Sequence, residues 1–228
     1  MDPVRGVALR LHGPLQSWGG PTVGDDRPTL AFPTRSGVLG LVGACMGILR
    51  SDQARLLDLA RGARVHVRVD APGTPMVDDQ TIQGHPAASP TRQTIQSKRS
   101  YLCDASFAVV VVPGPSVRVE QIVDALRSPV FSPFLGRRHC VPSTPLLLAP
   151  EVAADDPLGL FGALSRGPVE LVGDAPTSPD LDHYLDVDDH PRRLRRIVVR
   201  DDLAGPLGRQ FRERTVVHVR APGPRPSA

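Results

Sequence analysis

The sequence predicts an α+β fold in which the elements follow the order strand, helix, strand, strand, helix, strand. Two patterns predict this order. Apolar residues alternate with other residues in residues 7–11 and 64–70, which is the period of a half-buried strand. Residues 119–127 instead repeat apolar residues at the i, i+3, i+4 and i+7 positions of a helix. This order is typical of the ferredoxin-like fold, which RNA-recognition (RRM-like) modules share with many other proteins.

The first helix should follow a polar, glycine-rich loop that comes after the first strand. Residues 36–49 are almost continuously apolar, and they contain four glycines that would destabilise a solvent-exposed helix: Gly37, Gly40, Gly43 and Gly47. We therefore expect this helix to pack closely on a sheet. A second helical segment should begin near Ser51 or Asp52, because both residue types favour helix N-caps.

The second strand, residues 64–70, is expected to point three valines toward the core and Arg64, His66 and Arg68 outward. Its outward face would then be basic. The apolar run 107–112 predicts the third strand, residues 119–127 predict the next helix, and a last strand of the unit is expected within residues 139–148.

The connection over residues 71–105 is too long for a hairpin turn and too polar for a core, so it should project as a thumb-like insertion. The tetrapeptide QTIQ begins at Gln80 and again at Gln93. The two copies could be the arms of an extended hairpin, but we favour chance recurrence of common residue types. Basic residues gather near Tyr101, a combination suited to phosphate contact and base stacking: Arg92, Lys98 and Arg99.

The chain is expected to divide into a larger and a smaller part. Residues 1–150 would form the ferredoxin-like domain with its insertion, and residues 151–220 a β-rich subregion. Within the subregion, residues 195–200 and 215–220 have the pattern of paired strands. Residues 221–228 are expected to form a disordered tail.

Composition narrows the function classes. Lys98 is the only lysine among 27 basic residues, and arginine suits bidentate phosphate contacts, although codon bias could also explain its abundance. The three cysteines form no C-x-x-C pair, which argues against a disulfide framework or a zinc site. No segment approaches the ~20 apolar residues of a membrane span. We expect a cytoplasmic protein without a metal, a cofactor or a membrane partner.

The segment from Gly13 to Gly47 is the strongest candidate for a binding site. It joins the polar loop, with Gln16, Ser17, Trp18 and Arg27 as potential ligand contacts, to the start of the first helix. Residues 33–37 should present unpaired backbone N–H groups at the positive end of that helix. Such a junction favours an anion.

Five sequence blocks resemble, in order and spacing, the CasD family, the Cas-five-type subunits of Cascade. Cascade is the type I-E CRISPR surveillance complex. The blocks span most of residues 7–217: GPLQSWG, RPTLAFPTRSGVLGLVGACMG, TIQSKRSYLCDASF, PFLGRRHCVPSTPL and RQFRER. The resemblance implies a subunit with a ferredoxin-like domain and a projecting thumb. Such a subunit binds and caps the 5′ handle of the guide crRNA in antiviral defence. It also implies contacts with the CasC backbone subunit and the large CasA subunit, and with target DNA through the assembled complex, where base pairing by the RNA reads sequence.

Carried over to this chain, the family blocks give the following RNA-binding candidates: Gln16, Ser17, Trp18, Gly19, Arg27, Thr34, Arg35, Ser36, Gly37, Lys98, Arg99, Tyr101, Arg137 and Arg138. Arg35 and the N–H groups of the helix start would bind a handle phosphate. Trp18 or Tyr101 would stack on a splayed base, although either ring could instead pack in the core. The pair at 137–138 would neutralise the RNA backbone.

Two other function classes stay open. Relatives from type I-C systems cut repeat RNA without a metal, and Lys98, Tyr101 and either His85 or His139 could be nominated for such chemistry. We expect no catalysis, because no nucleophile and base are paired in the sequence and type I-E systems use a separate subunit, CasE, for cutting. The third class is a scaffold that binds only protein. One departure from the family is that residues 78–96 are shorter than a typical thumb and lack its tyrosine-histidine element.

Overall fold

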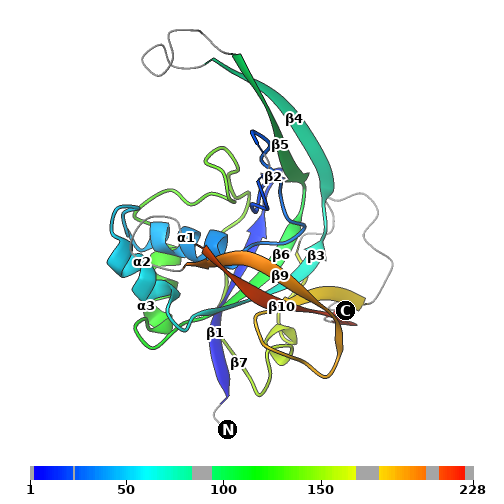
Figure 1. Cartoon of the computed structure of the whole chain (residues 1–228). Coiled ribbons are helices and arrows are strands. Elements are labelled where there is room, and N and C mark those ends of the chain that lie inside the picture. The colour runs from blue at the N-terminus through cyan, green and yellow to red at the C-terminus, as the bar shows by residue number, and fades with distance from the viewer. Residues whose placement is uncertain (1–2, 23, 84–93, 168–179, 204–210, 224–228) are drawn as a thin grey trace.

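The computed structural model describes residues 3–22, 24–83, 94–167, 180–203 and 211–223 (Figure 1). Its architecture is mixed α/β, with one seven-stranded and one three-stranded sheet, both antiparallel throughout. The large sheet has the strand order β7-β1-β6-β3-β8-β10-β9, and the small sheet β2-β5-β4. Among the described residues, no helix is long and apolar enough to cross a bilayer.

Four strands and two helices of the first 154 residues follow the predicted order along the chain. They are β1 (Val4–His12), α1 (Arg35–Cys45), β3 (Arg64–Ala71), β6 (Ser106–Val112), α3 (Val119–Arg127) and β7 (Leu147–Ala154). The last strand lies later than the predicted 139–148. Pro142 and Pro145 lack the N–H groups that a strand ladder needs, and this segment contributes only single backbone bonds beside β1.

Helix α1 begins where the side chain of Thr34 accepts a hydrogen bond from the N–H of Gly37, which makes Thr34 its N-cap. The following helix, α2 (Gln53–Ala60), begins at its N-cap Asp52. A Cβ atom at Gly43 would lie 3.4 Å from side-chain atoms of α2, so close packing at this glycine is with a neighbouring helix and not with the sheet that we expected. Gly40 is exposed, and a Cβ atom there would meet nothing within 4 Å, so close packing does not require a glycine at this position.

The main core lies between the helices and one face of the large sheet, where Val65 and Val67 of β3 are buried with Val42 of α1. The opposite face corrects our expectation of an exposed basic strand. Arg64 is exposed as expected, but His66 and Arg68 are fully buried on this face, where the segment around the 3₁₀ turn η1 (Gly159–Phe161) packs against Arg68. Arg68 donates to the carbonyl oxygens of Phe161 and Leu164, both at 3.0 Å, and pairs with Asp70.

The C-terminal strands extend the same sheet. They are β8 (Asp180–Leu185), β9 (Arg193–Leu203) and β10 (Phe211–Pro222). The predicted pairing of residues 195–200 with 215–220 is confirmed by the β9–β10 register, in which Ile197 faces Val216. Strand β8 then joins this pair to β3, with Arg68 opposite His183. The C-terminal strands are therefore hydrogen-bonded to the sheet that the earlier strands form.

The insertion projects from the body as a long hairpin of β4 (Thr74–Gln83) and β5 (Thr94–Cys103) (Figure 1). The two QTIQ copies face each other across it, with Thr81 opposite Gln96 and Ile82 opposite Ile95. The repeat thus forms the two arms of the hairpin, and the chance recurrence that we favoured is wrong. At its base, β5 also pairs with β2 (Leu15–Gln16). His85 and Arg92 lie outside the described residues.

Candidate RNA-binding groove

The loop after β2 folds back onto the base of the hairpin. The N–H of Arg27 donates to the carbonyl oxygen of Lys98 at 2.8 Å, and the N–H of Ser100 donates to the carbonyl oxygen of Arg27 at 3.0 Å. Arg27 and Arg99 therefore form a parallel β-bridge. These two arginines are distant in sequence, and the bridge fixes them side by side on the backbone.

A turn at residues 135–140 closes the other side of the groove. Its backbone is tied to the loop by the N–H of Ser17, which donates to the carbonyl oxygen of Leu135 at 3.1 Å. Gly136 has φ +89° and approaches so closely that a Cβ atom there would lie 1.6 Å from the carbonyl oxygen of Ser17. Only glycine fits this crossing. The Nη2 of Arg137 then donates to the carbonyl oxygen of Arg27 at 2.8 Å.

Between the loop, the hairpin and the turn lies a groove with a volume of about 280 Å³. We call it the arginine groove. It is lined by Ser17, Gly19, Gly20, Thr22, Arg27, Pro28, Arg99, Gly136 and Arg137. No carboxylate is in this lining. A close described carboxylate is that of Asp26, which accepts from the N–H of Lys98 at 3.4 Å.

The arginines of the groove are short of acceptors. Among the described residues, Arg27, Arg99 and Arg137 form no ion pair within 4.0 Å. The Nε of Arg99 and the Nη1 of Arg137 are buried without a hydrogen-bond partner. Buried donors without acceptors cost free energy, which an anion with several acceptor oxygens would recover. The groove is therefore suited to an anion.

Arg137 is held by an aromatic side chain. Its guanidinium lies over the ring of Tyr101, 4.4 Å from the ring centroid. The Tyr101 hydroxyl in turn lies 3.1 Å from the Nε2 of His139. Tyr101 is 2 % exposed, so it cannot stack on a base as one of our two alternatives required, and it packs instead. Its role in the groove is to orient Arg137.

The structure brings together five of the fourteen sequence-predicted residues in the arginine groove: Ser17, Gly19, Arg27, Arg99 and Arg137. Lys98 and Arg138 are exposed and are sequence neighbours of groove residues, but they do not line the arginine groove. Trp18 is 1 % exposed and donates its indole N–H to Gln16, itself fully buried, at 3.0 Å. Of the two alternatives for Trp18, base stacking is therefore wrong, and the ring packs in the core, where it anchors the loop.

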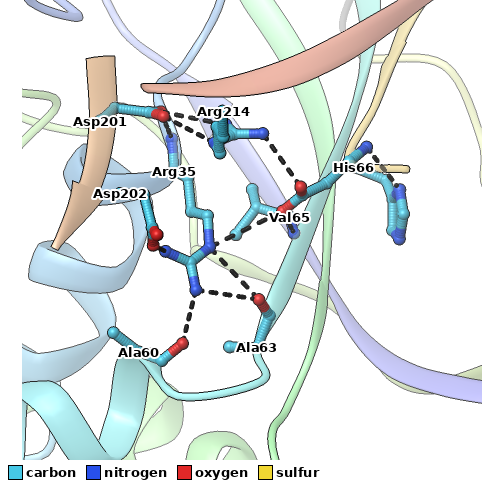
Figure 2. Close-up of polar contacts among 9 residues, drawn as sticks. Arg35, Ala60, Ala63, Val65, His66, Asp201, Asp202 and Arg214 are labelled. Atoms are coloured by element: carbon cyan, nitrogen blue, oxygen red, sulfur yellow. Dashed lines mark hydrogen bonds and ion pairs between the residues drawn. The ribbon is translucent and has the colours of Figure 1, made fainter. Parts of the chain in front are cut away.

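Arg35 also requires a correction, because the structure buries the side chain that we expected to bind a handle phosphate (Figure 2). Its guanidinium pairs with Asp202 and donates to the carbonyl oxygens of Ala60 and Ala63. These groups come from β9, from the end of α2 and from the turn between α2 and β3. The hydrogen-bond donors of Arg35 are therefore engaged within the protein.

The positive end of α1 contacts a carboxylate of the protein itself, that of Asp201. The N–H of Arg35 donates to the carboxylate of Asp201 at 2.6 Å, and the N–H of Gly37 donates to Thr34. Asp201 reaches this position because a register shift in the β9–β10 pair bends β9 at this point. The N–H groups expected for a handle phosphate are thus occupied at Arg35 and Gly37; Ser36 is half-buried beside them.

Arg214 of β10 completes this cluster (Figure 2). It bonds Asp201 through Nε at 2.6 Å and lies 3.1 Å from Asp186. Burial by itself would lower the pKa of Arg214, but these carboxylates raise it above its usual value. The cluster of Arg35, Asp186, Asp201, Asp202 and Arg214 fixes the start of α1 to the C-terminal strands.

Sequence reasoning did not include Gly136 among the binding residues, although this glycine shapes the groove. A glycine directly before two arginines was a usable signal for a tight turn that presents them. It also missed Gly20, Thr22 and Pro28, which are common loop residues without a distinguishing pattern. Nothing in the spacing of Asp201 and Arg35 along the chain indicated that they would meet.

Comparison with known proteins adds independent information. A protein-family model described as "CRISPR-associated protein (Cas_Cas5)" matches residues 6–217. The chain is 40% identical over 162 residues to the CRISPR system Cascade subunit CasD of Escherichia coli (strain K12). The aligned region covers 65% of this chain and 72% of that protein.

Solved structures agree. A chain of a "CRISPR RNA-guided surveillance complex" superposes with a TM-score of 0.68 and 33% identity, covering 96% of this chain and 90% of that chain. A second structure, described as "Crystal structure of Cas protein", gives a TM-score of 0.63 and 31% identity over 96% of this chain and 97% of the other.

Proposed function

The chain belongs to the Cas5 family of CRISPR-associated proteins, and on this premise we propose that it is the subunit of a type I-E surveillance complex that holds the 5′ handle of the guide RNA. The observation that carries the RNA-binding part is the arginine groove. Three guanidinium groups meet there without a carboxylate in the lining, and two of them have buried donors without acceptors. Phosphate oxygens of an RNA backbone satisfy both needs.

The groove would contact the ribose-phosphate backbone of the RNA handle more than the bases of the handle. Its floor and walls are glycine, serine and threonine beside the arginines, and the two large aromatic rings nearby, Trp18 and Tyr101, are buried. Small residues let a ribose-phosphate chain approach closely, whereas base stacking needs an exposed ring. We therefore assign phosphate binding to Arg27, Arg99 and Arg137, and leave Trp18 and Arg35 out of the binding site.

We infer that the subunit does not cut RNA. The phenol of Tyr101 is buried, so it cannot reach RNA, and the exposed His139 beside it is bonded to that phenol. Acid–base cleavage of RNA needs both an acid and a base that reach the reacting groups directly or through one water, and the tyrosine of this pair does not. Metal-independent cleavage of repeat RNA is the alternative function, and cleavage of the RNA in EDTA would distinguish it.

The central fold supports the same assignment. We infer that β1, α1, β3, β6, α3 and β7 form a ferredoxin-like βαββαβ unit, because β1 lies between β7 and β6 and because α1 and α3 pack on one core. The long hairpin would be the thumb of this unit, and residues after 154 its β-rich C-terminal extension. We further propose that the unit contacts the CasC backbone subunit and the large CasA subunit. Its free thiols at Cys45, Cys103 and Cys140 suit the cytoplasm.

The test is charge reversal in the groove within the assembled complex. Arg99→Glu and Arg27→Glu are expected to lower the amount of guide RNA that co-purifies with a tagged backbone subunit, because each places a carboxylate beside the phosphate path. Arg50→Glu is the matched control, since Arg50 is exposed on the turn between α1 and α2, outside the groove. Equal RNA retention in all variants would contradict the proposal.

The purified chain separates the alternatives. We expect it to shift a repeat RNA in a native gel, more weakly as salt rises, and to leave the RNA intact in EDTA. Cleavage in EDTA would support the endoribonuclease. Failure to bind RNA, together with a normal association with the backbone subunit, would support a protein-only scaffold.

A further inference from the structure

A second cavity lies on the sheet face that η1 covers, away from the arginine groove. Its volume is about 540 Å³, which is within the range of small-molecule sites. It is lined by the segment around η1, by the turn before β9 and by the end of β10, together with single residues of β3 and β8. It shares no lining residue with the arginine groove. We call it the His183 cavity.

Three neighbouring strands set the inner end of this cavity. β3 places Arg68 opposite His183 of β8, and β10 places Val219 opposite the same histidine. Directly opposite residues share one face of a sheet, so the His183 ring lies on the η1 side, where the ring of Phe161 meets it edge-on with centroids 5.3 Å apart. Arg68 is already engaged by Asp70 and by carbonyl oxygens. The histidine is therefore the buried lining group with a free position.

His183 offers a hydrogen-bond acceptor to the cavity. Its Nδ1 lies 3.0 Å from the carbonyl oxygen of Leu181, and a carbonyl oxygen only accepts, so Nδ1 carries the proton of the neutral ring and Nε2 holds the lone pair. Within the described residues this Nε2 has no partner, and unlike the Nε2 of His66 it is not enclosed. Burial lowers the pKa of His183 to about 4, so Nε2 stays an acceptor at neutral pH.

The rim of the cavity adds polar groups from two segments. Arg192 is exposed and forms no ion pair within the part of the chain that the structure describes. Its N–H donates to the Nδ1 of His190 at 3.1 Å, which leaves the Nε2 of that neutral ring as a donor. In the η1 segment, the exposed Asp156 uses Oδ1 to accept from the N–H of Gly159 at 2.8 Å, and its Oδ2 is bonded to no described residue.

Apolar residues complete the lining between these polar groups. Leu158 is half-buried beside η1, and Pro191 and Pro222 are exposed at the turn before β9 and at the end of β10. Gly159 and Gly162 add no side chain that would narrow the opening. An apolar lining with a few placed polar groups is typical of a site for a small ligand, in which the polar groups fix the orientation.

We propose that the His183 cavity binds a ribonucleoside 5′-phosphate, either free or at one position of a single-stranded RNA. The base packs against the apolar lining, and one of its N–H groups donates to the Nε2 of His183. The phosphate pairs with Arg192 and accepts from His190, and a ribose hydroxyl donates to Asp156. A nucleotide supplies in one molecule the planar body, the donor, the anion and the hydroxyls that these groups require. The proposal does not depend on the arginine groove binding the guide RNA.

Isothermal titration calorimetry of AMP into the full chain tests the site. We expect saturable binding that His183→Phe weakens about fivefold, because phenylalanine keeps a ring but lacks the acceptor. Arg192→Glu should weaken binding at least about tenfold, and Arg50→Glu, the matched change at an exposed arginine outside the cavity, should have no effect. Asp156→Asn keeps an oxygen for the N–H of Gly159 and should weaken binding about threefold.

The adenosine hexamer rA6 distinguishes the two sources of the nucleotide. If Arg192→Glu weakens the binding of both AMP and rA6, the cavity accepts a nucleotide within a strand. If it weakens only AMP, the ligand is the free nucleotide. Melting temperatures verify folding, and because Arg192 and Asp156 are exposed, their variants carry the test even where His183→Phe unfolds.

Two outcomes would overturn the proposal. One is that AMP, GMP, CMP and UMP all give no saturable heat at several millimolar. The other is that the three cavity variants bind AMP like wild type, or that Arg99→Glu of the arginine groove abolishes AMP binding, since the nucleotide would then sit elsewhere. Either outcome is distinct from failure of the arginine groove, which is measured by the guide RNA that the complex retains with Arg99→Glu.

Discussion

The guanidinium of Arg137 lies over the buried ring of Tyr101, 4.4 Å from its centroid. This contact predicts that Tyr101 acts on RNA binding through the ring and not through the hydroxyl. Tyr101→Phe keeps the ring, so RNA affinity should stay within about twofold of wild type, while the lost bond to His139 costs about 1 kcal/mol of unfolding free energy. Tyr101→Leu removes a cation–π contact of about 1 kcal/mol, which corresponds to about fivefold in RNA affinity. Anisotropy titrations check this, and equal affinities of the two variants would contradict the orienting role.

Arg35 is predicted to govern stability and not RNA affinity. Arg35→Met leaves Asp202 without its partner and removes donors from the carbonyl oxygens of Ala60 and Ala63. Breaking one side of a buried ion pair typically costs about 3–5 kcal/mol, and because the Asp202 side chain is 37% exposed we expect a loss near the lower end of that range. Urea denaturation should show this loss, whereas Arg5→Ala, which removes an exposed pair with Glu151, should stay close to wild type. At temperatures where the variant is folded, its RNA affinity should equal that of wild type, and a weaker affinity would return Arg35 to the binding site.

Two buried histidines predict how stability depends on pH. Burial, helped by the charges of Arg64 and Arg214, lowers the pKa of His66 to about 3. Burial likewise lowers the pKa of His183 to about 4, despite its bond to the carbonyl oxygen of Leu181. Both rings stay neutral in the folded chain below the ordinary histidine pKa of about 6.5, while the unfolded chain takes up protons. Stability is therefore complete above about pH 6.5 and falls as the pH decreases toward 4 and 3.

At pH 5 each histidine should cost about 2 kcal/mol of unfolding free energy relative to pH 8. Urea denaturation at the two pH values measures the sum. In the wild-type protein, His66 Nδ1 accepts a hydrogen bond from the N–H of Asp186 at 3.2 Å. The variant His66→Asn keeps an acceptor for this N–H. This variant should lose about half of the dependence between pH 6.5 and 5. An unchanged dependence would mean that His66 is not protected from protonation in the folded state.

Most strands and helices could be predicted from the sequence, because their apolar periods match the faces that they bury. The exceptions have physical causes. His66 and Arg68 alternate with valines as the residues of a half-exposed strand do, and period alone cannot reveal that η1 covers the second face. Residues 139–148 look apolar enough for a strand, but prolines remove its donors. For the QTIQ repeat the error was of the opposite kind. We judged the repeat too short to be significant, but its two copies pair as the arms of the hairpin.

The candidate site was predicted in part. The loop with Arg27 was identified from its polar, glycine-rich sequence, and Arg99 and Arg137 were named because they stand in the blocks that resemble the family. The helix start attracted the same interpretation, and sequence could not show that Asp201, 166 residues from Arg35, would occupy it. Long-range ion pairs of this kind depend on how the sheet closes and on a bulge in β9, neither of which leaves a local pattern.

Gly136 offers the sharpest test of the groove itself, because it can be altered without changing any charge. A Cβ atom at this position would lie 1.6 Å from the carbonyl oxygen of Ser17, and the backbone has φ +89°. Gly136→Ala must therefore separate the turn from the loop and move Arg137 away from Arg27. Gly19→Ala is the matched control, since Gly19 also lines the groove with φ +70°, but a methyl group there would meet no atom within 4 Å. Its cost should be only the strain of a left-handed residue, about 1–2 kcal/mol, or about 2–8 °C in melting temperature. Gly136→Ala should lower the melting temperature further and weaken RNA binding at least about tenfold at a temperature where the variant is folded, because it displaces Arg137 from the other two arginines. If both alanine variants bind RNA equally well, the crossing of Gly136 and Ser17 does not shape the RNA site.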